Sequence, residues 1–303
     1  MKTKESIQLP STSTTHNNIQ THEDISRKLR LELVNNNEKT FKKYKENVPN
    51  TSIFIKPKNF KFVFQMCGKY EEKILPVDYS LFVQSWPGEL CDRMNCHVST
   101  NTRFVPEGFL IHGFWPQSNE GFINCCSNEN SIENVENLIL TNKELKKEIG
   151  KYWFSKNKCR FALYEFDKHG SCTLDVFKGE RGPLDYYWMV INLRKNIDIW
   201  TLLKESELKV KPMNRYKFVE IKNVLKQQIG VEPVIKSTNF GSIAEVVICY
   251  DLNEENKHNP KPINCPYYMY ENEWNNSPEY IYFKPFPEAF KNIEKTTKTD
   301  CDY

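Results

Sequence analysis

The pattern of apolar and polar positions divides the chain near residue 53. Residues 1–52 are polar, rich in Asn, Thr, Lys and Glu, and show no sustained apolar period. Such a composition predicts a disordered arm, with at most one helical stretch around residues 24–34. Aromatic and β-branched residues become frequent from residue 53 onward. We therefore expect one folded domain over residues 53–303.

Several stretches of this domain have the pattern of strands. Phe60, Phe62 and Phe64 alternate with Lys61 and Val63, as in a half-buried strand. Two aromatic-rich runs predict central strands, the first ending in a Pro-Gly turn and the second at a proline, and two later runs predict further strands. These four runs are "YSLFVQSWPG" (79–88), "EGFLIHGFWPQ" (107–117, stopped by Pro116), "SIAEVVICYDL" (242–252) and "EYIYFKP" (279–285).

Between these strands lie stretches whose apolar residues recur every three or four positions, which predicts helices. In residues 131–150, Ser131 can serve as the N-cap, Val135 and Ile139 share a face, and Gly150 closes the segment. "DYYWMVINLRKN" and "NRYKFVEIKNVLKQQIG" have the same character. Strands, then helices, then strands predict an α+β domain with an antiparallel central sheet that carries helices on one side.

Composition narrows the class of protein. The 42 basic and 39 acidic residues give a formal charge of only +3, so a polyanion would have to be bound locally rather than by a basic block. The longest apolar run, around "VVICY", is too short to span a bilayer. We expect no membrane span and no metal or other cofactor.

Ten cysteines without a C-x-x-C pair indicate scattered disulfides rather than a zinc site. Disulfides predict an oxidising compartment, and sequons at Asn50 and Asn275 agree with export and glycosylation. The first 20 residues nevertheless lack the apolar core of a signal peptide. We expect a secreted or lysosomal/vacuolar protein whose export route the sequence leaves open.

Two histidines are the candidates for chemistry. Taken singly, His112 in an apolar run fits a buried structural histidine, and His169 before Gly170 fits the C-terminus of a helix. Taken together, a pair of imidazoles can accept one proton and donate another near neutral pH, as cleavage of a phosphodiester requires. Lys168 could stabilise the negative transition state, and Glu165 lies four residues before His169, on the same helical face.

These residues lie in segments that resemble the ribonuclease T2 family. "IHGFWP" is similar to the family's first active-site segment, commonly IHGLWP, and departs from it only at Phe114. "YEFDKHGSC" is similar to the second, commonly HEWxKHGTC. "FVQSWPGELC", "VVICYD" and "INCP" extend the resemblance, in the family's order, over residues 78–285.

The resemblance implies a metal-free endoribonuclease that cleaves single-stranded RNA by attack of the ribose 2′-hydroxyl on the adjacent phosphorus. A 2′,3′-cyclic phosphate forms and is hydrolysed to a 3′-phosphate, and DNA is not cleaved. By position, His169 resembles the general base and His112 the general acid. Glu165 and Lys168 resemble the pair that stabilises the transition state. We expect the enzyme to act as a monomer.

Three aromatic positions complete the implied substrate site. Trp115 and Phe161 resemble stacking residues of two base sites, although core packing remains an alternative for each. Tyr164 stands where the second motif normally has a histidine that helps bind phosphate. A phenol cannot supply the positive charge of an imidazolium, so we expect weaker phosphate binding and reduced activity. Phe166 replaces the motif's tryptophan, a change that a core can absorb.

The resemblance also implies three disulfides. These are Cys91 with Cys96, Cys172 with Cys125 or Cys126, and Cys249 with Cys265. Ser237 stands where relatives usually have a cysteine bonded to one near the C-terminus, so Cys301 lacks its usual partner. The pairing among Cys67, Cys159, Cys301 and the spare member of Cys125 and Cys126 stays open.

Two other functions compete with an active ribonuclease. The first is a catalytically weakened protein of the same fold that binds RNA or a partner, favoured by Tyr164 and the long polar arm. The second, a zinc-dependent hydrolase, lacks any supporting ligand spacing.

Overall fold

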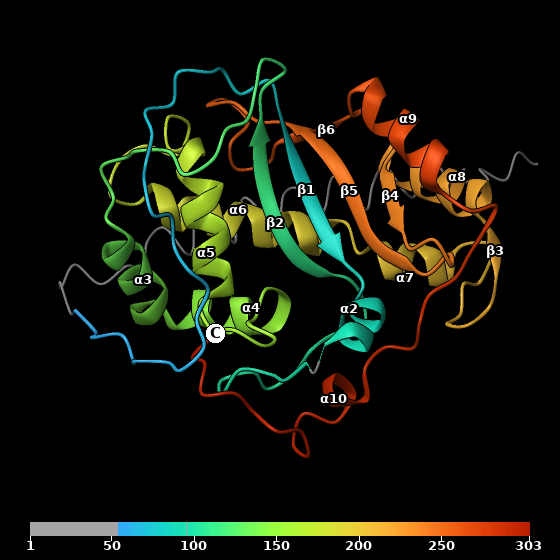
Figure 1. Cartoon of the computed structure of the whole chain (residues 1–303), viewed down its shortest axis with the longest axis horizontal. Coiled ribbons are helices and arrows are strands. Elements are labelled where there is room, and N and C mark those ends of the chain that lie inside the picture. Colours follow the sequence, from blue (N-terminus) through green and yellow to red (C-terminus); the bar gives the residue numbers. More distant parts are fainter. Residues whose placement is uncertain (1–53, 95) are drawn as a thin grey trace, which may run out of the picture. The chain divides into compact units, whose positions relative to one another are not determined.

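A computed structural model describes residues 54–94 and 96–303 of the protein (Figure 1). The arm expected over residues 1–52, its helical stretch and the sequon at Asn50 lie outside these residues. Within them, no helix combines the length and the apolar character needed to cross a bilayer.

An antiparallel sheet forms the centre of the domain, with strands in the order β2-β1-β5-β4 and β6 beside β5 (Figure 1). The antiparallel sheet with helices confirms the predicted α+β class. The strand bounds are β1 (Tyr79–Ser85), β2 (Leu110–Gln117), β4 (Val234–Ser237), β5 (Ile243–Asp251) and β6 (Lys261–Ile263). A second, two-stranded sheet joins β3 (Tyr216–Lys217) to β7 (Tyr280–Ile281).

Most helices lie between β2 and β4 in sequence. They are α3 (Ile132–Thr141), α4 (Lys143–Tyr152), α5 (Phe161–Lys168) with the 3-10 turn η1 (Gly170–Thr173), α6 (Gly182–Asn196), α7 (Ile199–Glu205) and α8 (Phe218–Ile229). Three others stand apart: α2 (Pro87–Arg93), α9 (Tyr267–Asn276) and α10 (Glu288–Lys291). The helices predicted from "DYYWMVINLRKN" and "NRYKFVEIKNVLKQQIG" correspond to α6 and α8, and Gly230 ends α8 in the left-handed conformation.

Three strand predictions were wrong in detail. Residues 60–64 form no strand; Val63 makes only an isolated bridge with Cys159, and Phe62 is exposed. The second run does not stop at Pro116, and its strand is not central. Because β2 is an edge strand, a residue without an N–H group can lie within it. "EYIYFKP" contributes only the two residues of β7.

The helix boundaries also differ from the prediction. Ser131 does cap a helix, but residues 131–150 form two helices that break at Asn142. The Asn142 side chain accepts a hydrogen bond from the Leu145 N–H at 2.9 Å and so begins α4. Gly150 lies within α4. The expected Pro-Gly turn after β1 is the start of α2, where Pro87 occupies the first turn.

The two faces of the sheet have different neighbours. Phe82 and Phe114 point toward α6, where the Phe114 ring lies 6.3 Å from that of Tyr186. On the opposite face, Val83 and neighbouring buried residues form a cluster to which α9 contributes Tyr270. Helix α5 lies beside the edge strand β2 (Figure 1). The side of the sheet opposite α6, next to α5, is therefore the place where motif residues from β2 and α5 can meet.

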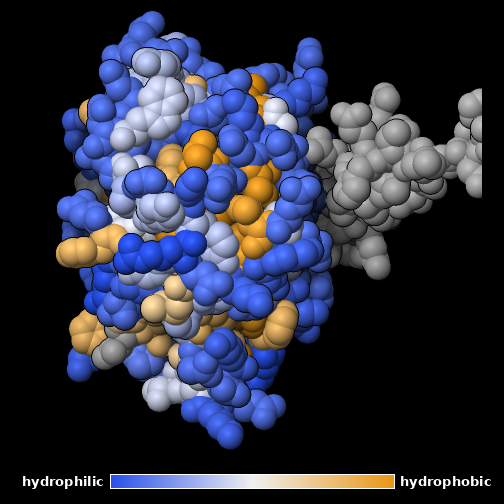
Figure 2. All heavy atoms as spheres, turned by 90° about the vertical axis from the view of Figure 1, so that its right-hand side faces the viewer, coloured by the Kyte–Doolittle hydropathy of each residue, from blue (hydrophilic) through white to orange (hydrophobic). Residues whose placement is uncertain are grey.

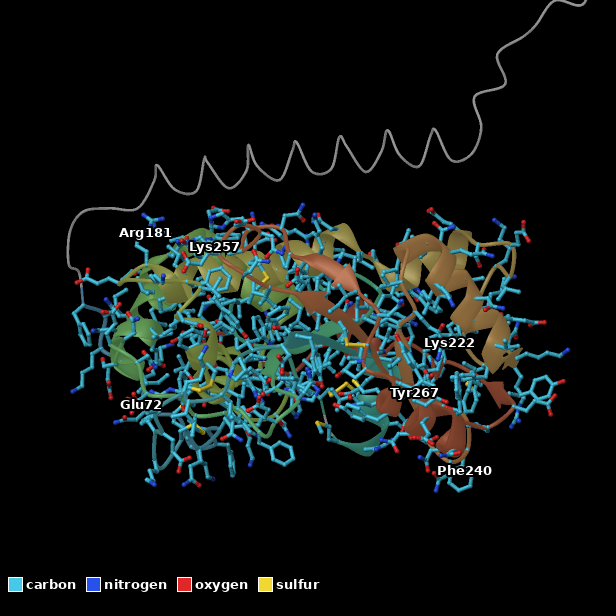
Figure 3. All side chains as sticks on the ribbon, turned by 90° about the horizontal axis from the view of Figure 1, so that it is seen from above. Glu72, Arg181, Lys222, Phe240, Lys257 and Tyr267 are labelled. Atoms are coloured by element: carbon cyan, nitrogen blue, oxygen red, sulfur yellow. A yellow bond between two sulfur atoms is a disulfide. The ribbon has the colours of Figure 1, made fainter. Side chains whose placement is uncertain are left out.

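The part of the domain that carries α8 and α9 is seen face-on in Figure 2, where hydrophobic side chains lie in patches among hydrophilic ones. Lys222, which is labelled in Figure 3, belongs to α8. It is buried and forms ion pairs with Glu273 of α9 and, at 3.0 Å, with Glu232. These ion pairs connect α8 to α9 within the fold.

All ten cysteines are paired. Cys91–Cys96 and Cys249–Cys265 agree with the pairs that the resemblance implies, and Cys172 takes Cys126 of its two candidates. The open pairings are Cys67–Cys125 and Cys159–Cys301.

Candidate active site

A bulge in the edge strand positions His112. Val83 of β1 pairs with Gly113 and Gln84 pairs with Ile111, so His112 has no partner across the ladder. Its carbonyl accepts a hydrogen bond from the Trp153 indole N–H at 3.0 Å, which anchors the bulge from within the core. Bulges redirect side chains locally. Here the imidazole remains one-third exposed.

Glu245 of β5 holds the His112 ring from one side. Its Oε1 lies 2.6 Å from Nδ1 of His112, and its Oε2 lies 3.2 Å from the ammonium of Lys236. Burial would raise the pKa of Glu245, but the hydrogen bond and charge of His112, together with Lys236, lower it to about 2. The ionised carboxylate therefore favours a hydrogen on Nδ1 of His112 and leaves Nε2 facing Glu165, whose Oε1 is 3.9 Å away.

Helix α5 presents the second motif. Its N-cap residue, Arg160, has a left-handed φ of 68° and forms an ion pair of 2.8 Å with Glu136. The helical spacing places Phe161, Glu165 and the following His169 on related turns, and the His169 N–H donates to the Glu165 carbonyl at 3.0 Å. The expected common face of Glu165 and His169 is thus present at the end of α5.

Glu165 is enclosed between the two motifs. Its side chain is only 3% exposed, and Oε2 accepts a hydrogen bond from the Trp115 indole N–H at 2.7 Å. Burial raises the pKa of Glu165, while His112, Trp115 and Lys168 act in the opposite direction. Gly113 makes this approach possible, because a Cβ there would collide with both the Glu165 carboxylate and the Trp115 indole.

Trp115 brings the two histidines to one site. Its ring centroid lies 5.0 Å from that of His112 and 5.1 Å from that of His169. Burial, together with the charges of Lys168 and His112, lowers the pKa of His169 to about 3. Nδ1 of His169 is buried and has no hydrogen-bond partner among the described residues. One imidazole is therefore neutral while the other lies beside an ionised carboxylate.

Lys168 and Tyr164 lie next to each other on α5. The Lys168 ammonium donates a hydrogen bond to the Tyr164 hydroxyl at 3.3 Å. The Tyr164 ring stacks on Phe64, with centroids 4.9 Å apart and an interplanar angle of 25°. Tyr164 is thus held on one side by a ring and at its hydroxyl by an ammonium.

Phe161 is more enclosed than a base-stacking residue needs to be. It is 8% exposed, with the rings of Phe64 and His112 at 5.2 and 5.8 Å and the ammonium of Lys156 at 4.8 Å. Little of its surface is open to a base in this arrangement. Its role in base stacking stays a prediction, as does that of Trp115.

Two disulfides connect the end of α5 to distant segments. Cys126–Cys172 ties the loop after β2 to η1, and Cys67–Cys125 ties the segment that carries Phe64 to the same loop. The Cys125 N–H donates to the Lys168 carbonyl at 2.7 Å. The backbone that ends in His169 is therefore restrained from both sides.

Comparison with known proteins identifies the family of this site. The Ribonuclease T2 family model matches residues 77–265. The chain belongs to the ribonuclease T2 family. It is 30% identical to ribonuclease DdI of Dictyostelium discoideum over 187 residues, which cover 58% of this chain and 74% of that protein.

Other relatives agree. Extracellular ribonuclease LE of Solanum lycopersicum is 27% identical, with 57% of this chain and 76% of that protein covered. Among solved structures, RNase NT in complex with 5′-AMP has a TM-score of 0.52 and 28% identity, and covers 70% of this chain and all of that one.

The T2 family match leaves out residues 54–76, so Phe64 and Cys67, which lie against α5, come from a segment outside it. Sequence reasoning missed this contact. It also missed Glu245 and Lys156, which lie inside the match. Glu245 is the one charged side chain in "IAEVVICY", and that lone charge in an apolar strand was the signal that could have found it.

No group of three or more His, Cys, Asp or Glu side chains in the described part of the chain has an arrangement that could hold a metal ion.

Proposed function

We propose that this T2-family protein is an endoribonuclease that cleaves single-stranded RNA through His112 and His169. The observation that carries the proposal is the unequal pair of imidazoles on the Trp115 ring. A neutral, buried His169 is suited to accept a proton, and His112, beside the ionised Glu245, is suited to carry one. Membership of a ribonuclease family and the likeness to RNase NT support the assignment.

In the first step, the substrate 2′-hydroxyl loses its proton to His169 as its oxygen forms a bond to phosphorus. The bond from phosphorus to the 5′-oxygen breaks, and Nε2–H of His112 protonates that leaving oxygen. The products are a 2′,3′-cyclic phosphate and a free 5′-hydroxyl. In a second step water takes the place of the leaving oxygen, the two histidines exchange roles, and a 3′-phosphate forms.

Two further side chains stabilise the negative charge that develops on the phosphate. The Lys168 ammonium and the Glu165 carboxyl both lie on α5, next to His169. Burial raises the pKa of Glu165, so the protonated form that can donate a hydrogen bond to a phosphate oxygen becomes more accessible. Every step uses side chains and water alone, so the proposed reaction needs no metal. DNA has no 2′-hydroxyl and is not cleaved.

We propose that the protein works in an oxidising compartment, secreted or lysosomal/vacuolar, as a monomer. Five disulfides and the likeness to an extracellular ribonuclease support this location.

A second candidate function is RNA binding with little cleavage. The Tyr164 hydroxyl is already bound by Lys168, and Phe161 is enclosed by Phe64. The first contact leaves the Tyr164 hydroxyl less available to bind a phosphate, and the second leaves less of the Phe161 ring available to stack on a base.

RNA digestion separates the two candidates. Purified protein is incubated with yeast RNA and EDTA over about pH 4 to 8, beside His112→Ala and His169→Ala, with His97→Ala as the matched control outside the site. We expect wild type and the control to release cyclic-phosphate ends and the two site variants to lose this activity. A silent wild type that still retards RNA in a gel would favour the binding function. Cleavage that survives in either site variant would overturn the proposed mechanism.

A further inference from the structure

Lys156 is a buried lysine at the edge of the candidate site. It is 7% exposed, and its ammonium lies 4.8 Å from the centroid of the Phe161 ring. Phe161 in turn lies 5.8 Å from the His112 ring. The charge of Lys156 lowers the pKa of Glu165, and the charges of Glu165 and Glu245 raise the pKa of Lys156. The ammonium therefore belongs to the same electrostatic environment as the acid histidine.

Lys156 forms no ion pair with any residue that the structure describes. Lys222 is the other buried lysine of the described residues, and two carboxylates neutralise it. No carboxylate within residues 54–94 and 96–303 lies within ion-pair distance of Lys156. Burial of an ammonium without a direct counterion costs free energy. An anion that binds beside it would reduce that cost.

The site also lacks a positive charge that its motif normally provides. Tyr164 occupies the histidine position of the second motif and cannot become a cation near neutral pH. His169 is neutral, and the Lys168 ammonium is engaged by the Tyr164 hydroxyl. Phosphodiester cleavage places additional negative charge on the phosphate oxygens in the transition state. A further cation near His112 is what this chain requires.

We propose that Lys156 supplies this charge and stabilises the scissile phosphate of bound RNA, in place of the imidazolium that Tyr164 cannot provide. The inference rests on the proposed ribonuclease function. It adds an electrostatic residue outside both family motifs. In a site shielded from water a positive charge acts over several ångströms, so Lys156 can contribute from beneath Phe161.

The protonation of Lys156 gives the proposal a pH signature. Burial lowers the pKa of Lys156 to about 8, while Glu165 and Glu245 act in the opposite direction. The folded-state pKa lies below the ordinary lysine value, so the ammonium is present at acidic and neutral pH and is lost as pH rises through about 8.

The test compares Lys156→Gln with wild type on a fluorogenic RNA oligonucleotide from about pH 5 to 9.5, with Lys158→Gln as the matched control. Lys158 is two residues away and exposed, with its ammonium over Phe64. We expect Lys156→Gln to lower kcat/KM about 10- to 100-fold at pH 6 and Lys158→Gln to change it less than about threefold. The ratio of kcat/KM of wild type to that of Lys156→Gln should fall toward one above pH 8, because the wild type loses the ammonium there. The pH dependence of the two histidines affects both proteins and cancels in this ratio.

A second comparison uses the Tyr164→His background. If an imidazolium at position 164 replaces the missing charge, removal of Lys156 should cost less there than in the native background. A Lys156→Gln variant as active as wild type, or a loss that is the same at every pH and in both backgrounds, would overturn the inference.

If Lys156→Gln does not fold, Lys156→Arg retains a charge that does not titrate, and its activity should persist above pH 8 relative to wild type. An Arg variant that follows the wild-type decline would equally refute it. A wild type that does not cleave RNA refutes the proposed function instead.

Discussion

Glu245 offers the sharpest test of how His112 is prepared to act as an acid. Glu245→Gln keeps the length of the side chain and an oxygen that can accept from Nδ1 of His112, but removes the negative charge. The variant should bind RNA nearly as well as wild type and cleave it more slowly, because the carboxylate stabilises the imidazolium form from which the proton is donated.

The structure sets the size of this effect. The pKa of Glu245 falls from 4.5 to about 2 although burial acts to raise it. One pKa unit corresponds to about 1.4 kcal/mol, so the net preference for the ionised carboxylate, after the cost of burial, is roughly 3 kcal/mol. His112 and Lys236 both contribute to this stabilisation of the Glu245 carboxylate. The charge-assisted part at His112 is then on the order of 1.5–3 kcal/mol, which predicts a fall in kcat of about 10- to 100-fold.

The assay measures kcat and KM separately for wild type, Glu245→Gln and Lys236→Met. Lys236→Met is the matched control, since it removes the other partner of Glu245 and leaves the contact with His112 in place. Stability gives a second measurement. A carboxyl whose folded-state pKa is depressed stabilises the fold above its unfolded pKa, and this contribution disappears as pH falls through about 2. The difference in urea midpoint between wild type and Glu245→Gln should therefore shrink from pH 5 toward pH 2. An unchanged kcat in the glutamine variant would show that His112 does not depend on this carboxylate.

Three other changes have defined outcomes. Gly113→Ala should destabilise the fold by about 1–3 kcal/mol and reduce cleavage, because its Cβ meets the Glu165 carboxyl; an alanine variant with native melting temperature and activity would contradict the close packing. Tyr164→His should raise kcat/KM on RNA, and no gain at any pH would mean that this position does not bind phosphate. Replacing Cys159 and Cys301 together by serine opens a loop of 142 residues and should cost up to about 5 kcal/mol in urea unfolding, whereas a loss under about 1 kcal/mol would show that other contacts hold the C-terminus.

The sequence located the parts of the site whose residues are neighbours in the chain. His112 with Trp115, and Glu165 with Lys168 and His169, were recognisable because each set lies in one short segment that resembles a ribonuclease T2 motif, and helical spacing placed Glu165 on the face of His169. Glu245 was not, because its contact with His112 depends on the sheet order that places β5 beside β1. The lone charge of Glu245 in an apolar strand marks the residue, but no local pattern identifies His112 as its partner.

Two further differences have similarly long-range causes. Alternation at Phe60, Phe62 and Phe64 suggested a strand, but the Phe64 ring is fixed by Tyr164 rather than by a partner strand. The partner of Cys172 could not be predicted, because Cys125 and Cys126 are adjacent in the sequence and either could form the bond. The fold separates them: Cys125, which has a left-handed φ of 48°, bonds to Cys67, and Cys126 bonds to Cys172 in η1.

The proposed assignment of base and acid, which the resemblance implies by position in the motifs, is supported by burial and charge in this site. His169 is buried next to Lys168, so a proton on it is disfavoured and the ring stays available as an acceptor. His112 is more exposed, and its Nδ1 lies 2.6 Å from the ionised carboxylate of Glu245. A bound phosphate would bring negative charge close to His169 and raise its proton affinity at the moment when it must accept one. Reversal of the two proposed roles would require His169 to carry the proton that its burial and the charge of Lys168 disfavour.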